Sequence, residues 1–222
     1  MRQCDSGLIL PMKNVRKLYL LSLLISLLGV APAQLRIDAT GPIRHRKREP
    51  TIGSGGRVGR KLSLRVDASI PNPSPDAEGR TIVEFTLTNA SNEQIMIPTS
   101  PHPGDLEPPD AQAVYTEWTL GLLINLVQDA KTQVLPGGAV LFGNVEHTGS
   151  LVALAPGKSI RVLARVLLPR DPPEGARFVA YAGLDTETIS TKLGHTSSAG
   201  SEIGSATSQE YTLHELIGRV SH

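Results

Sequence analysis

The chain has 222 residues, of which 40% are hydrophobic, and a formal net charge of +1 at pH 7. Its single cysteine, Cys4, excludes a disulfide framework or a thiolate metal site within one chain. This near-neutral net charge is the sum of two regions of opposite charge. Residues 34–61 hold eight Lys or Arg against two acidic residues, a net of +6, and residues 62–222 hold ten against eighteen, a net of −8. The sequence therefore predicts a basic arm on an acidic body.

The N-terminal region has the pattern of a secretory signal. A basic segment, residues 12–17, precedes an apolar stretch over residues 18–30, and Ala31-Pro-Ala33 places small residues at the −3 and −1 positions. The apolar stretch is shorter than the roughly 20 residues that cross a bilayer. We predict a signal peptide over residues 1–33, with Met12 as a candidate true start and cleavage after Ala33. An uncleaved signal anchor that tethers the protein to the membrane is the alternative.

Residues 34–61 are predicted to form a basic flexible linker, because glycine, proline and charge keep such a segment from burying apolar surface. Its glycines match neither the P-loop nor the dinucleotide-binding pattern. It has no interleaved aromatic residues for base stacking, and export removes nucleic acid as a partner. The functional alternative to a tether is contact with anionic lipid headgroups or wall polymers. The cations for such a contact are Arg44, Arg46, Lys47 and Arg48.

From residue 62 the apolar residues recur with a period of two, which is typical of strands with one face in a core. The expected inward rows are Leu62, Leu64, Val66 and Ala68; Val83, Phe85 and Leu87; Trp118, Leu120, Leu122, Ile124 and Leu126; Ile160, Val162, Ala164 and Val166; and Phe178, Ala180 and Ala182. No helical pattern separates them, as parallel βαβ units would require. We predict an all-β fold, an antiparallel immunoglobulin-like β-sandwich of seven or eight strands over residues 62–187.

Turn residues separate these rows. Asn89-Ala-Ser-Asn92 links two strands, and Pro136-Gly-Gly138 supplies the fixed and the positive φ of a tight turn. Asn89-Ala-Ser91 is also a glycosylation sequon, which the turn explains sufficiently. Prolines end two of the strands: Pro71, Pro73 and Pro75 end the first, and Pro169, Pro172 and Pro173 end another.

Two of these runs carry a resemblance to a known class of domain. The segments "VEFTLTNASNEQIMIP", residues 83–98, and "LAPGKSIRVLARVLLP", residues 154–169, resemble bacterial extracytoplasmic immunoglobulin-like or fibronectin-like domains. The resemblance rests on turn motifs, implies the sandwich fold and implies no activity. The Cys-Trp-Cys framework of antibody domains is absent, since Trp118 is the one tryptophan.

Residues 188–222 are predicted to be a Ser/Thr/Gly-rich tail. Ser190–Ser208 is interpreted as a loop. After it, Leu213, Leu216, Ile217 and Val220 recur at helical spacing, with Thr207 and Glu210 as a capping box. A terminal strand over residues 209–213 competes with this helix, and both remain open.

The densest group of metal- or ligand-binding side chains lies in a proline-rich stretch and consists of His102, Asp105, Glu107 and Asp110. Their spacing matches no EF-hand, and the five prolines between residues 98 and 109 stiffen the segment. We interpret it as an exposed inter-strand loop and a candidate binding loop, because a rigid scaffold displays such loops.

The sequence has no catalytic signature. The G-x-S-x-G and H-E-x-x-H motifs are absent, and His147, Asp185 and His195 are scattered along the chain. We therefore predict a non-enzymatic protein without a cofactor or metal. It is expected to be a secreted or periplasmic module of the bacterial cell envelope that binds a protein or envelope polymer through loops or an edge strand. The alternatives are an inhibitor or binding partner of an extracellular enzyme, and an enzyme whose site is assembled from dispersed loops.

Overall fold

The computed structural model describes residues 35–41, 62–102, 114–192 and 195–219. The chain divides into two compact units, Met1–Gln34 and Leu35–His222, and all described residues belong to the second. The elements are β1 (Arg36–Asp38), β2 (Leu64–Asn72), β3 (Thr81–Asn89), β4 (Ile95–Pro98), β5 (Val114–Gln128), β6 (Lys131–Val134), β7 (Gly137–Asn144), β8 (Leu151–Leu154), β9 (Ser159–Val166), β10 (Arg177–Lys192), β11 (His195–Thr207) and α2 (Leu213–Gly218). The predicted signal peptide over residues 1–33 lies outside the described residues.

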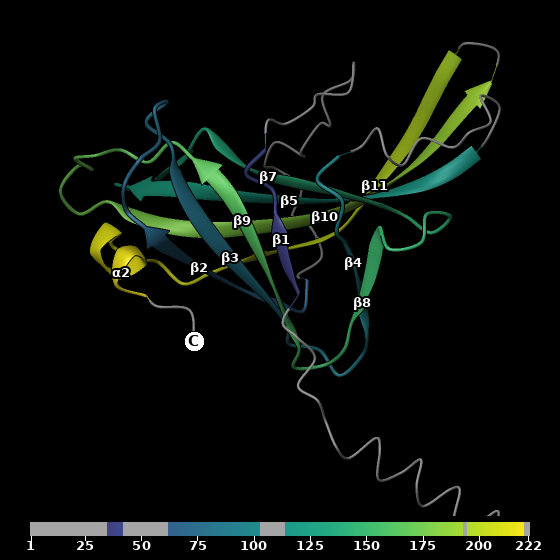
Figure 1. The fold of residues 1–222 in the computed structure, drawn as a ribbon, viewed down its shortest axis with the longest axis horizontal. Coiled ribbons are helices and arrows are strands. Elements are labelled where there is room, and N and C mark those ends of the chain that lie inside the picture. The colour runs from purple at the N-terminus through teal and green to yellow at the C-terminus, as the bar shows by residue number, and fades with distance from the viewer. Residues whose placement is uncertain (1–34, 42–61, 103–113, 193–194, 220–222) are drawn as a thin grey trace, which may run out of the picture. The chain divides into compact units, whose positions relative to one another are not determined.

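Nine strands form one sheet in the order β11-β10-β5-β7-β9-β3-β2, with β6 added to β5 and β1 added to β9. All of its pairs are antiparallel except β1 with β9. Strands β4 and β8 form a separate two-stranded sheet. The two ends of the long path meet where the Leu62 amide, just before β2, donates to the Ser205 carbonyl of β11 at 2.8 Å. The result is a nearly closed, barrel-like sheet (Figure 1).

The sheet turns a corner at two glycines at the start of β7. Gly137 pairs with Val166 and Gly138 with Arg165, and these pairs join β9, β3 and β2 to β7, β5, β10 and β11. Both glycines have positive φ, 105° and 110°. A Cβ on Gly137 would overlap the Arg165 carbonyl oxygen, and one on Gly138 would overlap the Leu122 carbonyl oxygen. The corner therefore requires glycine at both positions. The predicted positive φ is confirmed, although the segment turns a whole sheet rather than one hairpin.

The interior is filled by the apolar rows that the sequence predicts. Val83, Phe85 and Leu87 of β3 are fully buried, and the inward residues of the other rows are buried except Trp118, which is partly buried against the core. Phe178 of β10 and Leu122 of β5 are also completely buried. Burial of this apolar surface is the main favourable contribution to folding. The all-β, mostly antiparallel class is confirmed.

One residue expected to face water is buried instead. Glu84 of β3 is only 3% exposed and lies between two cations, Arg36 of β1 at 3.4 Å and Arg161 of β9 at 3.6 Å. A buried carboxylate is tolerated when it is paired in this way. Strand β1 thus brings one of the two arginines that compensate Glu84.

The predicted linker is corrected at its start. Residues 35–41 are described, and Arg36–Asp38 forms β1, which pairs in parallel with residues 161–163 of β9. Ile37 is buried there, and burial of its side chain together with the ion pair between Arg36 and Glu84 holds this segment to the sheet. Residues 42–61, which include Arg44, Arg46, Lys47 and Arg48, lie outside the described residues.

The predicted tail is also corrected. Ser190–Ser208, interpreted as a loop, contains the end of β10 and all of β11, and the two strands pair from Tyr181 with Thr207 to Lys192 with His195. Backbone hydrogen bonding along this long hairpin outweighs the low strand propensity of its small polar residues. Figure 1 shows the hairpin and the start of β5 extending beyond the other strands (upper right). Nine of the described strands, β2 to β10, begin within residues 62–187, where seven or eight were predicted, and β6, β7 and β8 among them carry no clear alternation.

The C-terminal segment contains both a short bridge to the sheet and a helix, the two alternatives that the sequence left open. Tyr211 forms an isolated bridge with Phe178, and the helix α2 begins two residues later. Its capping box consists of Thr212 and Glu215, not of the predicted Thr207 and Glu210. Each alternative that the sequence left open thus occurs in part, and the capping box lies five residues beyond the predicted one.

We predict that Gly138→Ala lowers the free energy of unfolding by more than about 3 kcal/mol, because the backbone itself must shift. The control is Gly149→Ala, which has a similar φ of 88° but open space around the added Cβ. Gly149→Ala should lower the free energy of unfolding by only about 1–2 kcal/mol, because alanine is disfavoured in the left-handed backbone conformation. Denaturant unfolding of both variants measures the difference, and equal losses would show that the close approach at the corner is not a constraint.

Candidate functional site

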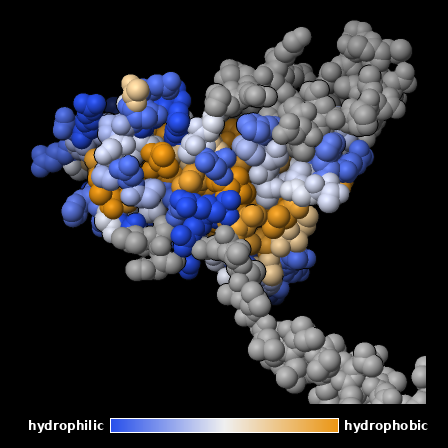
Figure 2. Space-filling view, in the orientation of Figure 1, coloured by the Kyte–Doolittle hydropathy of each residue, from blue (hydrophilic) through white to orange (hydrophobic). Residues whose placement is uncertain are grey.

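An open groove of about 450 Å³ lies where β2 ends, β3 begins and β9 leaves the sheet. It is lined from three parts of the chain: Ile70, Pro73, Pro75, Gly79 and Thr81; Leu168, Pro169 and Arg170; and Leu213 and Ile217 of α2. Most of these side chains are apolar. In Figure 2, apolar side chains come to the surface among hydrophilic ones on the side where Figure 1 places α2. We call this feature the end groove.

One wall of the end groove is a loop between β2 and β3 that is fixed by Asp76. Its carboxylate accepts hydrogen bonds from the amides of Glu78 and Arg80, each at 2.9 Å, and Arg165 of β9 lies 3.6 Å away. The Arg80 amide, with the Glu78 amide and the nearby cations Arg165 and Arg80, holds the pKa of Asp76 below its ordinary value. The Asp76 amide also donates to the Arg80 carbonyl at 2.7 Å. These contacts preorganise the wall before any ligand arrives.

Helix α2 forms another wall of the end groove. Leu216 anchors it, because that side chain is 1% exposed and belongs to the core. Thr212 caps the first turn by accepting from the Glu215 amide at 3.2 Å, and Glu215 accepts from the Thr212 amide at 2.6 Å. Leu213 and Ile217 then line the groove, and Ile217 remains 38% exposed.

A polar cluster ties α2 to β2. The Tyr211 hydroxyl donates to Asp67 of β2 at 3.0 Å, and Arg219 reaches both the Tyr211 hydroxyl oxygen, at 3.0 Å, and Asp67, at 3.4 Å. The Arg219 guanidinium also stacks on the Tyr211 ring, 4.3 Å from its centroid. Burial and the neighbouring Asp67 raise the pKa of the Tyr211 hydroxyl. Sequence reasoning missed this cluster, since its members are separated by up to 152 residues.

The charged residue in the lining is Arg170, in the connection that follows β9. It is exposed and forms no ion pair with the residues that the structure describes. The other arginines nearby differ, since Arg80 pairs with Glu78 at 3.3 Å and Arg165 with Asp76 at 3.6 Å. The end groove thus combines an apolar surface with one available cation.

The predicted binding loop is described only at its first residue. His102 lies in a small pocket of about 50 Å³ between Pro101, Ala139, Val140 and the end of β1. Asp105, Glu107 and Asp110 lie outside the described residues, so their grouping with His102 stays a prediction.

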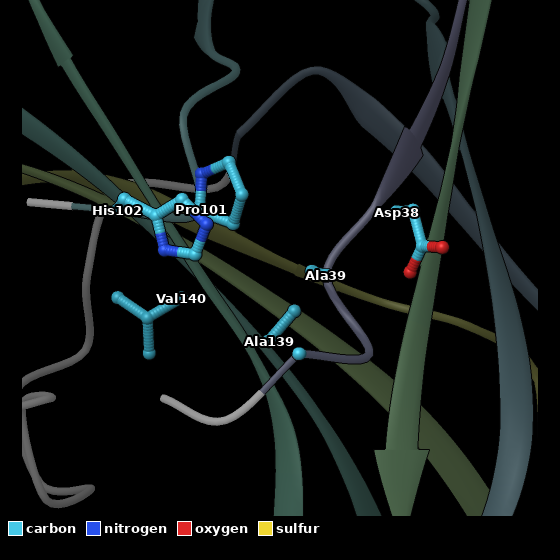
Figure 3. A pocket seen from close by; sticks show the side chains of 7 residues that line it. Asp38, Ala39, Pro101, His102, Ala139 and Val140 are labelled. Atoms are coloured by element: carbon cyan, nitrogen blue, oxygen red, sulfur yellow. The ribbon is translucent and has the colours of Figure 1, made fainter. Parts of the chain in front are cut away.

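His102 does not form an acid–base pair with Asp38, which also lines that pocket. Figure 3 shows the two side chains apart, with Ala39 between them. The Asp38 carboxylate accepts from the Thr40 hydroxyl at 2.6 Å and the Thr40 amide at 2.9 Å, and these bonds lower its pKa. Asp38 is therefore a local turn residue.

The sequon asparagine has a structural role in its turn. Asn89 is 1% exposed, and its amide group donates to the carbonyls of Glu93 and Leu154, both at 2.7 Å. Its side-chain oxygen accepts from the Ser91 amide at 2.9 Å. The turn interpretation of Asn89 is confirmed.

The described ranges contain no group of three or more His, Cys, Asp or Glu side chains placed to hold a metal ion. Within the same ranges, no helix has both the length and the apolar character needed to cross a bilayer.

No family model matches the chain, and no curated protein is detectably similar to it in sequence. Among solved structures, Northeast Structural Genomics Consortium target SoR45 is 12% identical, with 73% of this chain and 97% of that chain covered and a TM-score of 0.27. The structure titled "AvmM Catalyzes Macrocyclization in Alchivemycin A Biosynthesis" is also 12% identical, with 67% and 96% covered and a TM-score of 0.20. Similarities this low carry no argument about fold or function.

We predict that Asp76 makes the protein sensitive to acid. Because its pKa is lowered in the folded state, its ionised form stabilises the protein above its ordinary pKa of 3.8. That contribution is lost as the pH falls through the lowered value. Asp76→Asn keeps an acceptor oxygen but cannot ionise, so the difference in melting temperature between parent and variant should be constant near neutrality and shrink below pH 3.8.

The matched control is Asp171→Asn, because Asp171 is exposed and has no hydrogen bond or ion pair to the described part of the chain. Thermal melts across the acidic range should show no such change for this variant. A difference for Asp76→Asn that is independent of pH would contradict the proposed role of its charge in fixing the loop.

Proposed function

We propose that this chain is a secreted, non-enzymatic β-sandwich module of the bacterial cell envelope, and that it binds its partner at the end groove. The observation that carries the proposal is the groove itself: a rigid loop, a proline-containing connection and an anchored helix surround an apolar surface that remains open to solvent. Ligand-binding sites are commonly concave, mostly apolar and largely preformed, with few polar groups that orient the ligand.

The immunoglobulin-like arrangement is part of this proposal. Strands β2, β3 and β9 would form one layer and β7, β5, β10 and β11 the other. Two residue pairs, Gly137 with Val166 and Gly138 with Arg165, join these halves, which supports this division. In such sandwiches the loops cluster at the two ends, where they can bind partners. The end groove lies among such loops.

We further propose periplasmic or extracellular localisation, with membrane tethering by an uncleaved signal as the alternative. This rests on the basic, apolar and small-residue pattern of residues 12–33.

The end groove is tested by replacing Ile217, which lines it and is 38% exposed, with Asp. The charge should exclude an apolar partner without unfolding the protein, because the anchor Leu216 is unchanged. Mature chain beginning at Gln34 serves as bait in an envelope extract, and bound proteins and polymers are identified by mass spectrometry. We expect a partner that the parent retains and Ile217→Asp loses. Capture of a hydrolase in this way would favour the inhibitor class.

Met96→Asp is the matched control, since Met96 on β4 is 36% exposed and lies outside the groove lining. It should retain the partner as the parent does. If both variants retain it equally, the end groove is not the binding surface. Melting temperatures of all three proteins verify that loss of capture does not reflect unfolding.

The basic arm is proposed to hold the acidic body near anionic surfaces. Each cation near such a surface contributes about 1 kcal/mol, and salt screens the attraction over about 8 Å at physiological ionic strength. Mature protein should sediment with anionic liposomes at low salt and be released as salt rises. Joint replacement of Arg44, Arg46, Lys47 and Arg48 with Ser should abolish this without changing the melting temperature. If the substituted protein sediments with the liposomes as well as the parent does, the arm is only a tether.

A further inference from the structure

We propose that the end groove binds a linear aliphatic carboxylate, with the chain along the apolar lining and the carboxylate on Arg170. This rests on the proposed function, because it names the chemical class of ligand for the same site. Three properties of the groove support this ligand class: its apolar lining, its size and the unpaired cation in it.

The lining suits a linear hydrocarbon chain. Ile70 and Leu168, which are 2% and 9% exposed, belong to the core and also line the groove, so core side chains form part of its apolar surface. Leu213 and Ile217 of α2 add aliphatic surface. The prolines of the lining have no amide hydrogen to donate, so they add apolar surface without an unsatisfied donor.

The size also fits. A volume of about 450 Å³ lies within the range of small-molecule sites, which is about 300–1,000 Å³. The lining is held in place by Asp76 on one side and by the capped helix on the other, so little conformational freedom is lost on binding.

Arg170 selects the head group. Its guanidinium offers paired N–H donors that match the two oxygens of a carboxylate. Arg170 is the arginine in the lining and has no ion pair to the described residues, whereas Arg165 and Arg80, which are outside the lining, pair with Asp76 and Glu78. A cationic or neutral head group would gain nothing there, so the charge favours an anionic amphiphile.

The experiment is isothermal titration calorimetry of mature chain with octanoate, decanoate and dodecanoate below their micellar concentrations. We expect saturable binding that tightens about fourfold for each CH₂ that the groove accommodates. Nonyltrimethylammonium, which has the same nine-carbon tail as decanoate and the opposite charge, should bind more weakly. Methyl chemical shifts of Leu168, Leu213 and Ile217 should move on addition of decanoate.

Two variants locate the site, each with a matched control. Arg170→Gln should weaken decanoate binding about fivefold, as expected for an exposed ion pair, whereas Lys131→Gln, an exposed cation on β6, should not. Ile217→Ser should weaken binding of every chain, whereas Met96→Ser should not. Melting temperatures show that each variant is folded.

The proposal is overturned if the parent does not bind decanoate, if nonyltrimethylammonium binds as tightly, or if Arg170→Gln and Ile217→Ser bind like the parent. These outcomes differ from failure of the proposed function. A partner that is captured through Ile217 while decanoate fails to bind would keep the end groove as the binding surface and reject only the ligand class.

Discussion

The close backbone approach at Gly137 and Gly138 is the constraint on which the rest of the fold depends. At these residues β7 stops pairing with β9 and begins to pair with β5. Neither position has room for a Cβ. The consequences reach the end groove directly. The Leu167 amide donates to the Pro136 carbonyl at 2.8 Å, which fixes the chain just before Leu168 and Arg170 enter the lining.

The same corner also positions the other loop of the groove. Gly138 pairs with Arg165, and the Arg165 side chain reaches Asp76, the residue that organises the connection between β2 and β3. One backbone arrangement therefore determines where both loops lie. A rigid scaffold of this kind holds a binding surface open without help from the ligand.

The C-terminal segment completes the sheet and adds the third side of the groove. Ser208 and Tyr211 exchange hydrogen bonds with Ala180 and Phe178 along the start of β10, and α2 then packs against β2. The Tyr211, Asp67 and Arg219 cluster holds the helix there. The chain end thus joins the two edges of the sheet, whose strands are far apart in sequence.

The sequence predicts the parts of this structure that depend on local periodicity. The inward rows of β2, β3, β5, β9 and β10 follow from alternation, and the positive φ of Gly137 and Gly138 follows from their position after Pro136. Strand β11 escapes prediction because its small polar residues are held by pairing with β10 rather than by an apolar face.

The end groove escapes prediction for a different reason. Pro73, Pro75 and Pro169 are readily interpreted as residues that end strands. No local sequence pattern indicates that these strand ends lie next to each other and to α2. Their proximity is a consequence of the corner and of sheet closure, which involve pairs distant in sequence. The same holds for Asp67 with Tyr211 and Arg219.

The corner fixes the lining of the end groove most directly through the hydrogen bond that the Leu167 amide donates to the Pro136 carbonyl. Leu167 is 42% exposed, and without that hydrogen bond its amide would exchange like those of a surface loop. Native-state hydrogen exchange by NMR tests this directly. We expect the Leu167 amide to exchange as slowly as the core amides of β3 and β9. Exchange at the rate of the exposed loop amides would contradict the account.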